Sequence, residues 1–125
     1  PPRVRTAESS DEGETWSPAR DTDIPNPGSS LEVIRLRDGR WVMICNDTAI
    51  GRTRLSALMS DDEGVTWKWQ RVIEPLDYAG KSFAYPSVMQ GSDGKIHLSY
   101  SHVVKEGGAN IRYTVVDPEW IAAAR

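Results

Sequence analysis

The residue types that most often carry chemistry in proteins are few in this chain, and their spacing limits the chemistry open to them. His97 and His102 lack the spacing of metal ligands, so both are predicted to be surface or sheet-edge residues. Three consecutive acidic residues, 61–63, could attract calcium, but a turn motif accounts for Asp62 and solvent for its neighbours. Cys45 lies in an apolar stretch and is interpreted as a buried, unreactive thiol. We therefore predict no metal site and no cofactor.

An eight-residue motif with the pattern S-x-D-x-G-x-T-W occurs twice, at 9–16 and at 60–67. Its Asp can cap its own turn by accepting backbone N–H bonds, and the Gly two positions later supplies the positive φ that such a turn needs. The Trp three positions further on is large enough to lock the turn against a sheet. We predict that these positions hold structure and carry no chemistry: Ser9, Asp11, Gly13 and Trp16 in the first copy, and Ser60, Asp62, Gly64 and Trp67 in the second.

The repeated motif resembles the Asp box of the sialidase superfamily, also called the BNR repeat. The sequence between and after the two copies is also similar to that family, so the resemblance covers nearly the whole chain. In sialidases the box joins the third and fourth strands of a β-propeller blade, on the side away from the active site. The ending 115–121 is similar to natural C-termini of the family, which implies roughly the C-terminal third of a six-bladed propeller.

The resemblance also implies roles for individual residues. Sialidases are retaining glycosidases with a Tyr nucleophile, a Glu base, an Asp acid and three arginines that clamp the substrate carboxylate. The segment 83–87 resembles the part that supplies the nucleophile, so Tyr85 is the candidate; an ordinary inner-strand aromatic is the alternative. Arg52, with Leu55 three residues later, matches the third clamp arginine, and Arg54 is the runner-up; both could equally be solvated loop charges. The base, the acid and the other arginines belong to blades absent from this chain.

Composition narrows the class of protein. The 125 residues predict one domain, and a net charge of -3 gives no support to a nucleic-acid partner. The single Cys excludes an intrachain disulfide, and no apolar run approaches the roughly 20 residues that cross a bilayer. No signal peptide is visible, but a chain that opens Pro1-Pro2 without Met is consistent with an excised piece, so the compartment is left open.

Apolar and β-branched runs between turns predict nine strands and no helix of normal length. Asp-Gly turns at 37–40 and 91–94 are strong hairpin signals, and Pro86 is expected to break the strand in which it lies. The predicted strands are 3–8, 16–22, 31–36, 41–45, 54–59, 68–74, 83–90, 95–102 and 110–116. Between and after them we predict connectors at 24–30 and 75–82, loops at 46–52 and 103–109, a degenerate box at 117–120 and a last helical turn at 121–125.

The order of strand, Asp-Gly turn, apolar strand, loop, strand and box recurs with a period of about 50 residues, which is typical of propeller blades. The predicted fold class is therefore all-β, a partial β-propeller with about two blades. Residues 1–24 would form the outer strands of one blade, 25–75 a full blade, and 76–125 the inner strands of a further blade. A small β-sandwich is the alternative, which the repeat disfavours.

Two functions remain open at this point. The resemblance implies a fragment of a sialidase-like retaining glycoside hydrolase that releases terminal sialic acid from glycoconjugates, inactive as an isolated chain. The alternative is a non-catalytic carbohydrate-binding or scaffold module. In the first case Tyr85 and Arg52 should lie on one face, opposite Trp16 and Trp67. The expected partners are a sialylated or related glycan and either a second copy of the chain or the remainder of a larger propeller, with no membrane.

Overall fold

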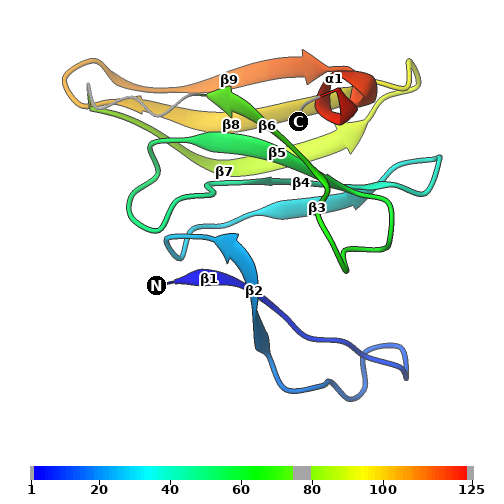
Figure 1. The fold of residues 1–125 in the computed structure, drawn as a ribbon. Helices are drawn as coiled ribbons and strands as arrows, with labels where there is room; N and C mark the ends of the chain where they lie inside the picture. Colours follow the sequence, from blue (N-terminus) through cyan, green and yellow to red (C-terminus); the bar gives the residue numbers. More distant parts are fainter. Residues whose placement is uncertain (1, 75–79, 124–125) are drawn as a thin grey trace.

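The computed structural model describes residues 2–74 and 80–123, which form three antiparallel sheets and one short helix (Figure 1). The first sheet holds β1 (Arg3–Thr6) and β2 (Arg20–Pro25). The second holds β3 (Glu32–Arg35), β4 (Trp41–Cys45), β5 (Leu55–Ser60) and β6 (Trp69–Glu74). The third holds β7 (Lys81–Gln90), β8 (Ile96–Val104) and β9 (Gly108–Val116), and α1 (Pro118–Ala122) follows it.

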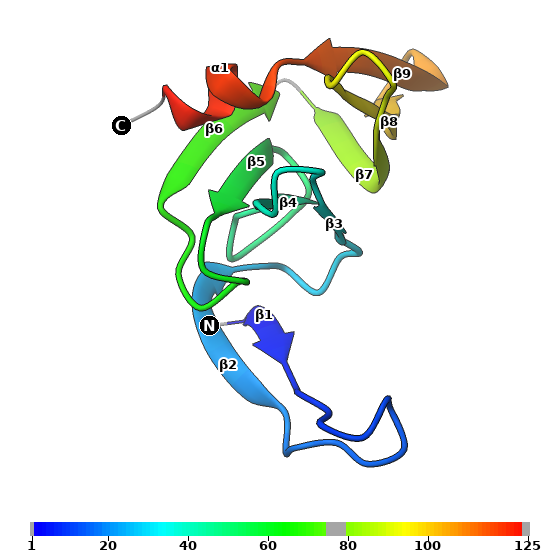
Figure 2. The same cartoon turned by 90° about the vertical axis from the view of Figure 1, so that its right-hand side faces the viewer.

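The sheets follow one another in chain order, with the second between the other two (Figures 1 and 2). Each strand pairs with the next along the chain inside its sheet, as in the blades of a propeller. The predicted fold class is confirmed: the chain is all-β and forms part of a β-propeller rather than a closed ring. Among the described residues, no helix has the length and apolar character needed to cross a membrane.

The second sheet is covered on both faces, and the sequence of β4 shows why. Because side chains alternate along a strand, Val42 and Ile44 share one face and Met43 and Cys45 share the other. The first pair belongs to the core formed with the third sheet, and the second pair belongs to the core formed with the first sheet. A continuous apolar run is therefore required here, because both faces of the strand are buried.

The third sheet shows the expected alternation. Ile96, Leu98 and Tyr100 alternate with more exposed residues along β8 and are all buried in the core shared with the second sheet. Two predicted boundaries near prolines are wrong. The strand β2 starts only at Arg20, and it includes Ile24 and Pro25. Pro25 is tolerated there because it is the last residue of an edge strand.

The second error concerns Pro86. It lies inside β7, and the strand continues through it with an irregular register between Ala84 and Ser87. β7 is an edge strand of its sheet, so the missing N–H of proline removes no ladder hydrogen bond on the open side. The irregularity also gives Tyr85 an unusual backbone conformation, which bears on the candidate site.

The predicted degenerate box at 117–120 is wrong, because this segment begins a helix. The side chain of Asp117 accepts a hydrogen bond from the Glu119 N–H at 2.9 Å, and Pro118 occupies the first turn. The helix packs against β5 and β6 of the second sheet and buries Ile121 in the core. It starts before the predicted turn at 121–125, of which 124–125 lie outside the described residues, as do 75–79 of the predicted connector.

Candidate functional site

The turns at the two ends of the strands differ in kind (Figure 1). We call the box end the one that carries the Asp boxes at 9–16 and 60–67 together with the Asp-Gly turns at 37–40 and 91–94. We call the loop end the opposite one, which carries the β4–β5 loop at 46–54. The Asp boxes and the β4–β5 loop are therefore separated by the length of the strands.

Both Asp boxes form closed hydrogen-bonded turns. In the second box the Asp62 carboxylate accepts bonds from the Thr66 N–H at 2.8 Å, from the Thr66 hydroxyl at 2.6 Å and from the Ser60 hydroxyl at 2.7 Å. The Thr hydroxyl bond is the largest reason why the pKa of Asp62 falls to about 2, and the pKa of Asp11 falls to about 2 for the same reason. Both carboxylates therefore stabilise their own turns through these hydrogen bonds.

The Trp residues of the two boxes differ in what they contact. Trp67 is partly buried against the core between the first and second sheets, whereas Trp16 is 63% exposed and donates its indole N–H to the Gly13 carbonyl at 3.0 Å. In the second box Trp41 of β4 also packs against Gly64. The first sheet contains only β1 and β2, so it has no strand in the position that β4 takes in the second sheet.

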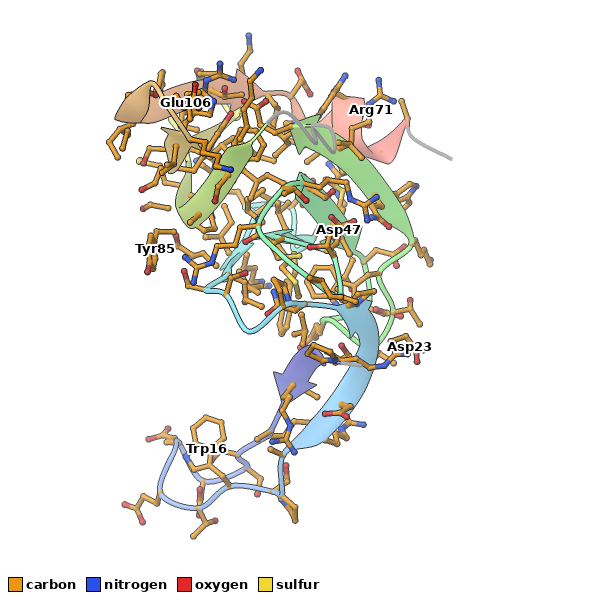
Figure 3. All side chains as sticks on the ribbon, turned by 90° about the vertical axis from the view of Figure 1, so that its left-hand side faces the viewer. Trp16, Asp23, Asp47, Arg71, Tyr85 and Glu106 are labelled. Carbon is orange, nitrogen blue, oxygen red and sulfur yellow. The ribbon has the colours of Figure 1, made fainter. Side chains whose placement is uncertain are left out.

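Arg52 and Tyr85 lie together at the loop end, although Arg52 belongs to the β4–β5 loop and Tyr85 to β7 of the third sheet. The Arg52 Cζ atom is 5.2 Å from the centroid of the Tyr85 ring, a cation–π contact. Tyr85 is 63% exposed, and Figure 3 shows its side chain projecting from the inner edge of the stacked sheets. Within the described part of the chain, no carboxylate pairs with the Arg52 guanidinium. The expected common placement, opposite Trp16 and Trp67, is observed, while the roles of both residues remain predictions.

The backbone at Tyr85 is held in a rarely populated conformation. Its φ is 53°, in the left-handed region that bulky residues seldom adopt, and such strain is most often found at functional sites. Two residues earlier, the Phe83 N–H donates to the Arg52 carbonyl at 2.7 Å. This bond ties the strand that carries Tyr85 to the loop that carries Arg52.

Asn46 is the anchor beneath this contact, and it is fully buried. Its side-chain amide donates to the carbonyls of Arg54 at 2.9 Å and Phe83 at 3.0 Å. Its side-chain oxygen accepts from the Ser29 hydroxyl at 2.6 Å. One side chain therefore joins the β4–β5 loop, the β2–β3 connector and β7. The sequence prediction named the polar loop but not this residue, because its partners are distant in the chain.

Arg54 has a different environment from Arg52. Its guanidinium donates to the Asp47 carboxylate at 2.9 Å and to the Asp47 carbonyl at 2.8 Å. Asp47, which is labelled in Figure 3, is buried and also accepts bonds from Ser56 and Gln70. A buried carboxylate needs such partners, so the Arg54 guanidinium neutralises the Asp47 carboxylate. Of the two candidate arginines, only Arg52 lacks a carboxylate partner among residues 2–74 and 80–123.

A second cluster that contains a tyrosine was not predicted from the sequence. The Tyr100 hydroxyl donates to the Glu74 carboxylate at 2.7 Å, and Arg112 pairs with the same oxygen. Burial, followed by the hydrogen bond to Glu74, raises the pKa of Tyr100 to about 12. Tyr100 is only 2% exposed, so it is an interior residue, and the cluster joins the second and third sheets.

The prediction that His102 is a surface residue is wrong. It is buried and stacks on Phe83 with ring centroids 5.4 Å apart, because its position on β8 continues the inward phase of Tyr100. His97 lies on the central strand β8 rather than at a sheet edge.

Cys45 is fully buried as predicted, and burial is the main reason that its pKa rises to about 12. Among the described residues, no cluster of His, Cys, Asp and Glu has the arrangement of a metal site.

The stacked antiparallel sheets, the Asp boxes at one end and the Arg–Tyr contact at the other define a sialidase-like or related β-propeller module. The sequence model of the BNR repeat-like domain family matches residues 2–98. Because the match covers most of the chain, the chain belongs to this family. No curated protein matches the chain.

Proposed function

We propose that the chain contributes part of the active site of a sialidase-like retaining glycoside hydrolase, which releases terminal sialic acid from glycoconjugates. The observation that carries the proposal is the unpaired Arg52 guanidinium lying over the exposed ring of Tyr85. A guanidinium binds a carboxylate with two parallel hydrogen bonds, and sialic acid bears a carboxylate on its anomeric carbon. Arg52 would hold that group, so that the anomeric carbon lies beside Tyr85.

In this proposal Tyr85 is the nucleophile. Its hydroxyl oxygen would bond to the anomeric carbon as the glycosidic oxygen leaves, and water would later release the sugar. A neutral phenol approaches a carbon that bears a carboxylate with less repulsion than Asp or Glu would. The general base, the general acid and further clamp arginines would come from other blades, since no described carboxylate touches the Tyr85 hydroxyl.

A non-catalytic carbohydrate-binding module is the second candidate. The observation that favours it is the exposed Tyr85 ring with the Arg52 guanidinium over it, which places an aromatic group and a cation together for an acidic sugar. Both candidates predict binding of an acidic sugar at the loop end. They differ in whether Tyr85 forms a bond.

Binding is tested on the chain itself by an NMR titration with N-acetylneuraminic acid, with neutral N-acetylmannosamine as the matched sugar. The acid should shift the Arg52 Nε–H and Tyr85 ring signals, and Arg52→Ala should abolish the effect. Arg20→Ala serves as the control variant, because Arg20 is an exposed residue paired with Glu8. Equal shifts with both sugars would contradict the assignment of Arg52.

Catalysis is tested in the longest polypeptide that carries the chain, with a fluorogenic sialoside. Tyr85→Phe should abolish turnover there and leave binding of the free acid intact. Binding without turnover in the unaltered polypeptide would favour the carbohydrate-binding module. The 125-residue chain alone should release no fluorophore.

We also propose that the chain assembles with a second copy or with the remainder of a larger propeller. The observation behind this is that β1 and β9 each pair with a single neighbouring strand, so each leaves one edge open. Open strand edges pair readily with another chain. Sedimentation at micromolar concentration tests the proposal for the isolated chain, and a soluble monomer under all conditions would contradict self-assembly.

A further inference from the structure

A hydrogen-bonded row of three side chains lies on the third sheet, near the box end and far from Tyr85. The Nε2 atom of His97 is 3.1 Å from both carboxylate oxygens of Asp93, and its Nδ1 atom is bonded to the Tyr113 hydroxyl. Asp93 belongs to the Asp-Gly turn before β8, whereas Tyr113 lies on β9. Nothing in the proposed glycan site uses these residues.

The order of these groups fixes the direction of the hydrogen bonds. An ionised carboxylate only accepts, so the Nε2 atom of His97 must carry the proton that it donates to Asp93. In the tautomer with this proton on Nε2, the lone pair lies on Nδ1 and can accept the hydrogen of the Tyr113 hydroxyl. The hydrogen bond from His97 is also the main reason why the pKa of Asp93 lies below its usual value, which keeps this carboxylate ionised.

The surroundings leave the end of this row open to solvent. Tyr113 is 64% exposed and lines a shallow depression of about 360 Å³ together with Met89 and Ser92. Gly91 forms part of the wall, and a Cβ atom there would lie 2.6 Å from the His97 Nε2 atom. The row therefore depends on a residue without a side chain at this position, and a small molecule can reach the Tyr113 hydroxyl.

We propose that Asp93, His97 and Tyr113 form a relay that makes the Tyr113 hydroxyl a nucleophilic site for small activated acyl donors. In the reaction the Tyr113 oxygen bonds to the acyl carbon and the bond between that carbon and the leaving group breaks. The phenolic proton passes to Nδ1 of His97 and from there to the leaving group. Asp93 is a positioning residue that selects the tautomer, as the carboxylate does in other carboxylate–His–nucleophile arrangements.

Tyr85 is a natural internal control, because its exposure of 63% nearly equals that of Tyr113 while its neighbour is the arginine Arg52 rather than an imidazole. The probe is N-acetylimidazole at neutral pH, with acetylation of each tyrosine followed by mass spectrometry of peptides. Tyr113 should be acetylated on the order of tenfold faster than Tyr85, below the usual range for a general base in a closed active site.

Two variants test the relay. His97→Gln removes the base, and Asp93→Asn presents an amide that can donate to Nε2 and so favours the other tautomer. Both should lower the Tyr113 rate to that of Tyr85 and leave the Tyr85 rate unchanged. If either substitution leaves the Tyr113 rate unaltered, or if Tyr113 reacts no faster than Tyr85 in the wild type, the relay is refuted.

A measurement on the unaltered chain makes the test independent of how well the variants fold. Nitrogen NMR of the His97 ring distinguishes the two neutral tautomers by the chemical shifts of its nitrogens. The relay requires a proton on Nε2 and none on Nδ1. A ring that carries its proton on Nδ1 would overturn the proposal, whatever the acetylation rates.

Discussion

Replacement of Asn46 by alanine tests the view that one buried amide holds the candidate site together. The substitution removes three hydrogen bonds and leaves the carbonyls of Arg54 and Phe83 and the hydroxyl of Ser29 without their partner. A buried polar group left unsatisfied costs about 1–3 kcal/mol, and water can reach the Arg54 carbonyl in part. We therefore expect Asn46→Ala to lower the free energy of unfolding by about 3–4 kcal/mol, a large share of the total for a small domain.

The assay is urea denaturation followed by tryptophan fluorescence, with linear extrapolation to water. Asn110→Ala is the matched control, because Asn110 is an exposed residue on β9 and its loss should change the stability by less than about 0.5 kcal/mol. Since Phe83 lies just before Tyr85 in β7, Asn46→Ala should also shift the ring signals of Tyr85. A loss of stability below about 1 kcal/mol would refute the role assigned to the Asn46 network.

Three further predictions concern the box end and the core. Because the folded pKa of Asp62 is about 2, against an ordinary 3.8, its contribution to stability is complete above about pH 4 and lost as the pH falls towards 2; the melting temperature of Asp62→Asn should therefore depend less on pH in this range. Gly64→Ala should destabilise the chain more than Gly13→Ala, since both have positive φ but only the former brings a Cβ to 3.0 Å from Trp41; equal unfolding midpoints would contradict this. Cys45 should react with a thiol reagent only in denaturant, and rapid labelling of the native chain would show that its strand opens.

Local sequence was sufficient where the deciding interactions are local. The hydrogen bonds of the Asp box join residues two and four positions apart, such as Ser60, Asp62 and Thr66, so the motif specifies its own turn. The apolar run of β4 and the alternation of β8 likewise match a strand that is buried on both faces and a strand that is buried on one. These patterns fix the all-β class because the side-chain period of two is a property of the strand itself.

The predictions from local sequence were wrong where the same residues are compatible with two structures. An acid followed by a Trp suggested a third box at 117–120, but Asp117 before Pro118 caps a helix equally well, and the packing of Ile121 under β6 selects the helix. Pro86 looked like a strand break, yet an edge strand tolerates it.

The tertiary structure alone decided how the candidate site is built. Arg52 and Arg54 stand two positions apart in one loop, and only the folded chain brings the Asp47 carboxylate against Arg54 and the Tyr85 ring against Arg52. The left-handed backbone of Tyr85 and the bonds of Asn46 depend on contacts between segments that are distant in the sequence. The sequence determines which strands form and which faces are apolar, because those properties repeat along the chain. It does not determine which arginine is paired, because that depends on how the β4–β5 loop folds the Asp47 carboxylate onto Arg54.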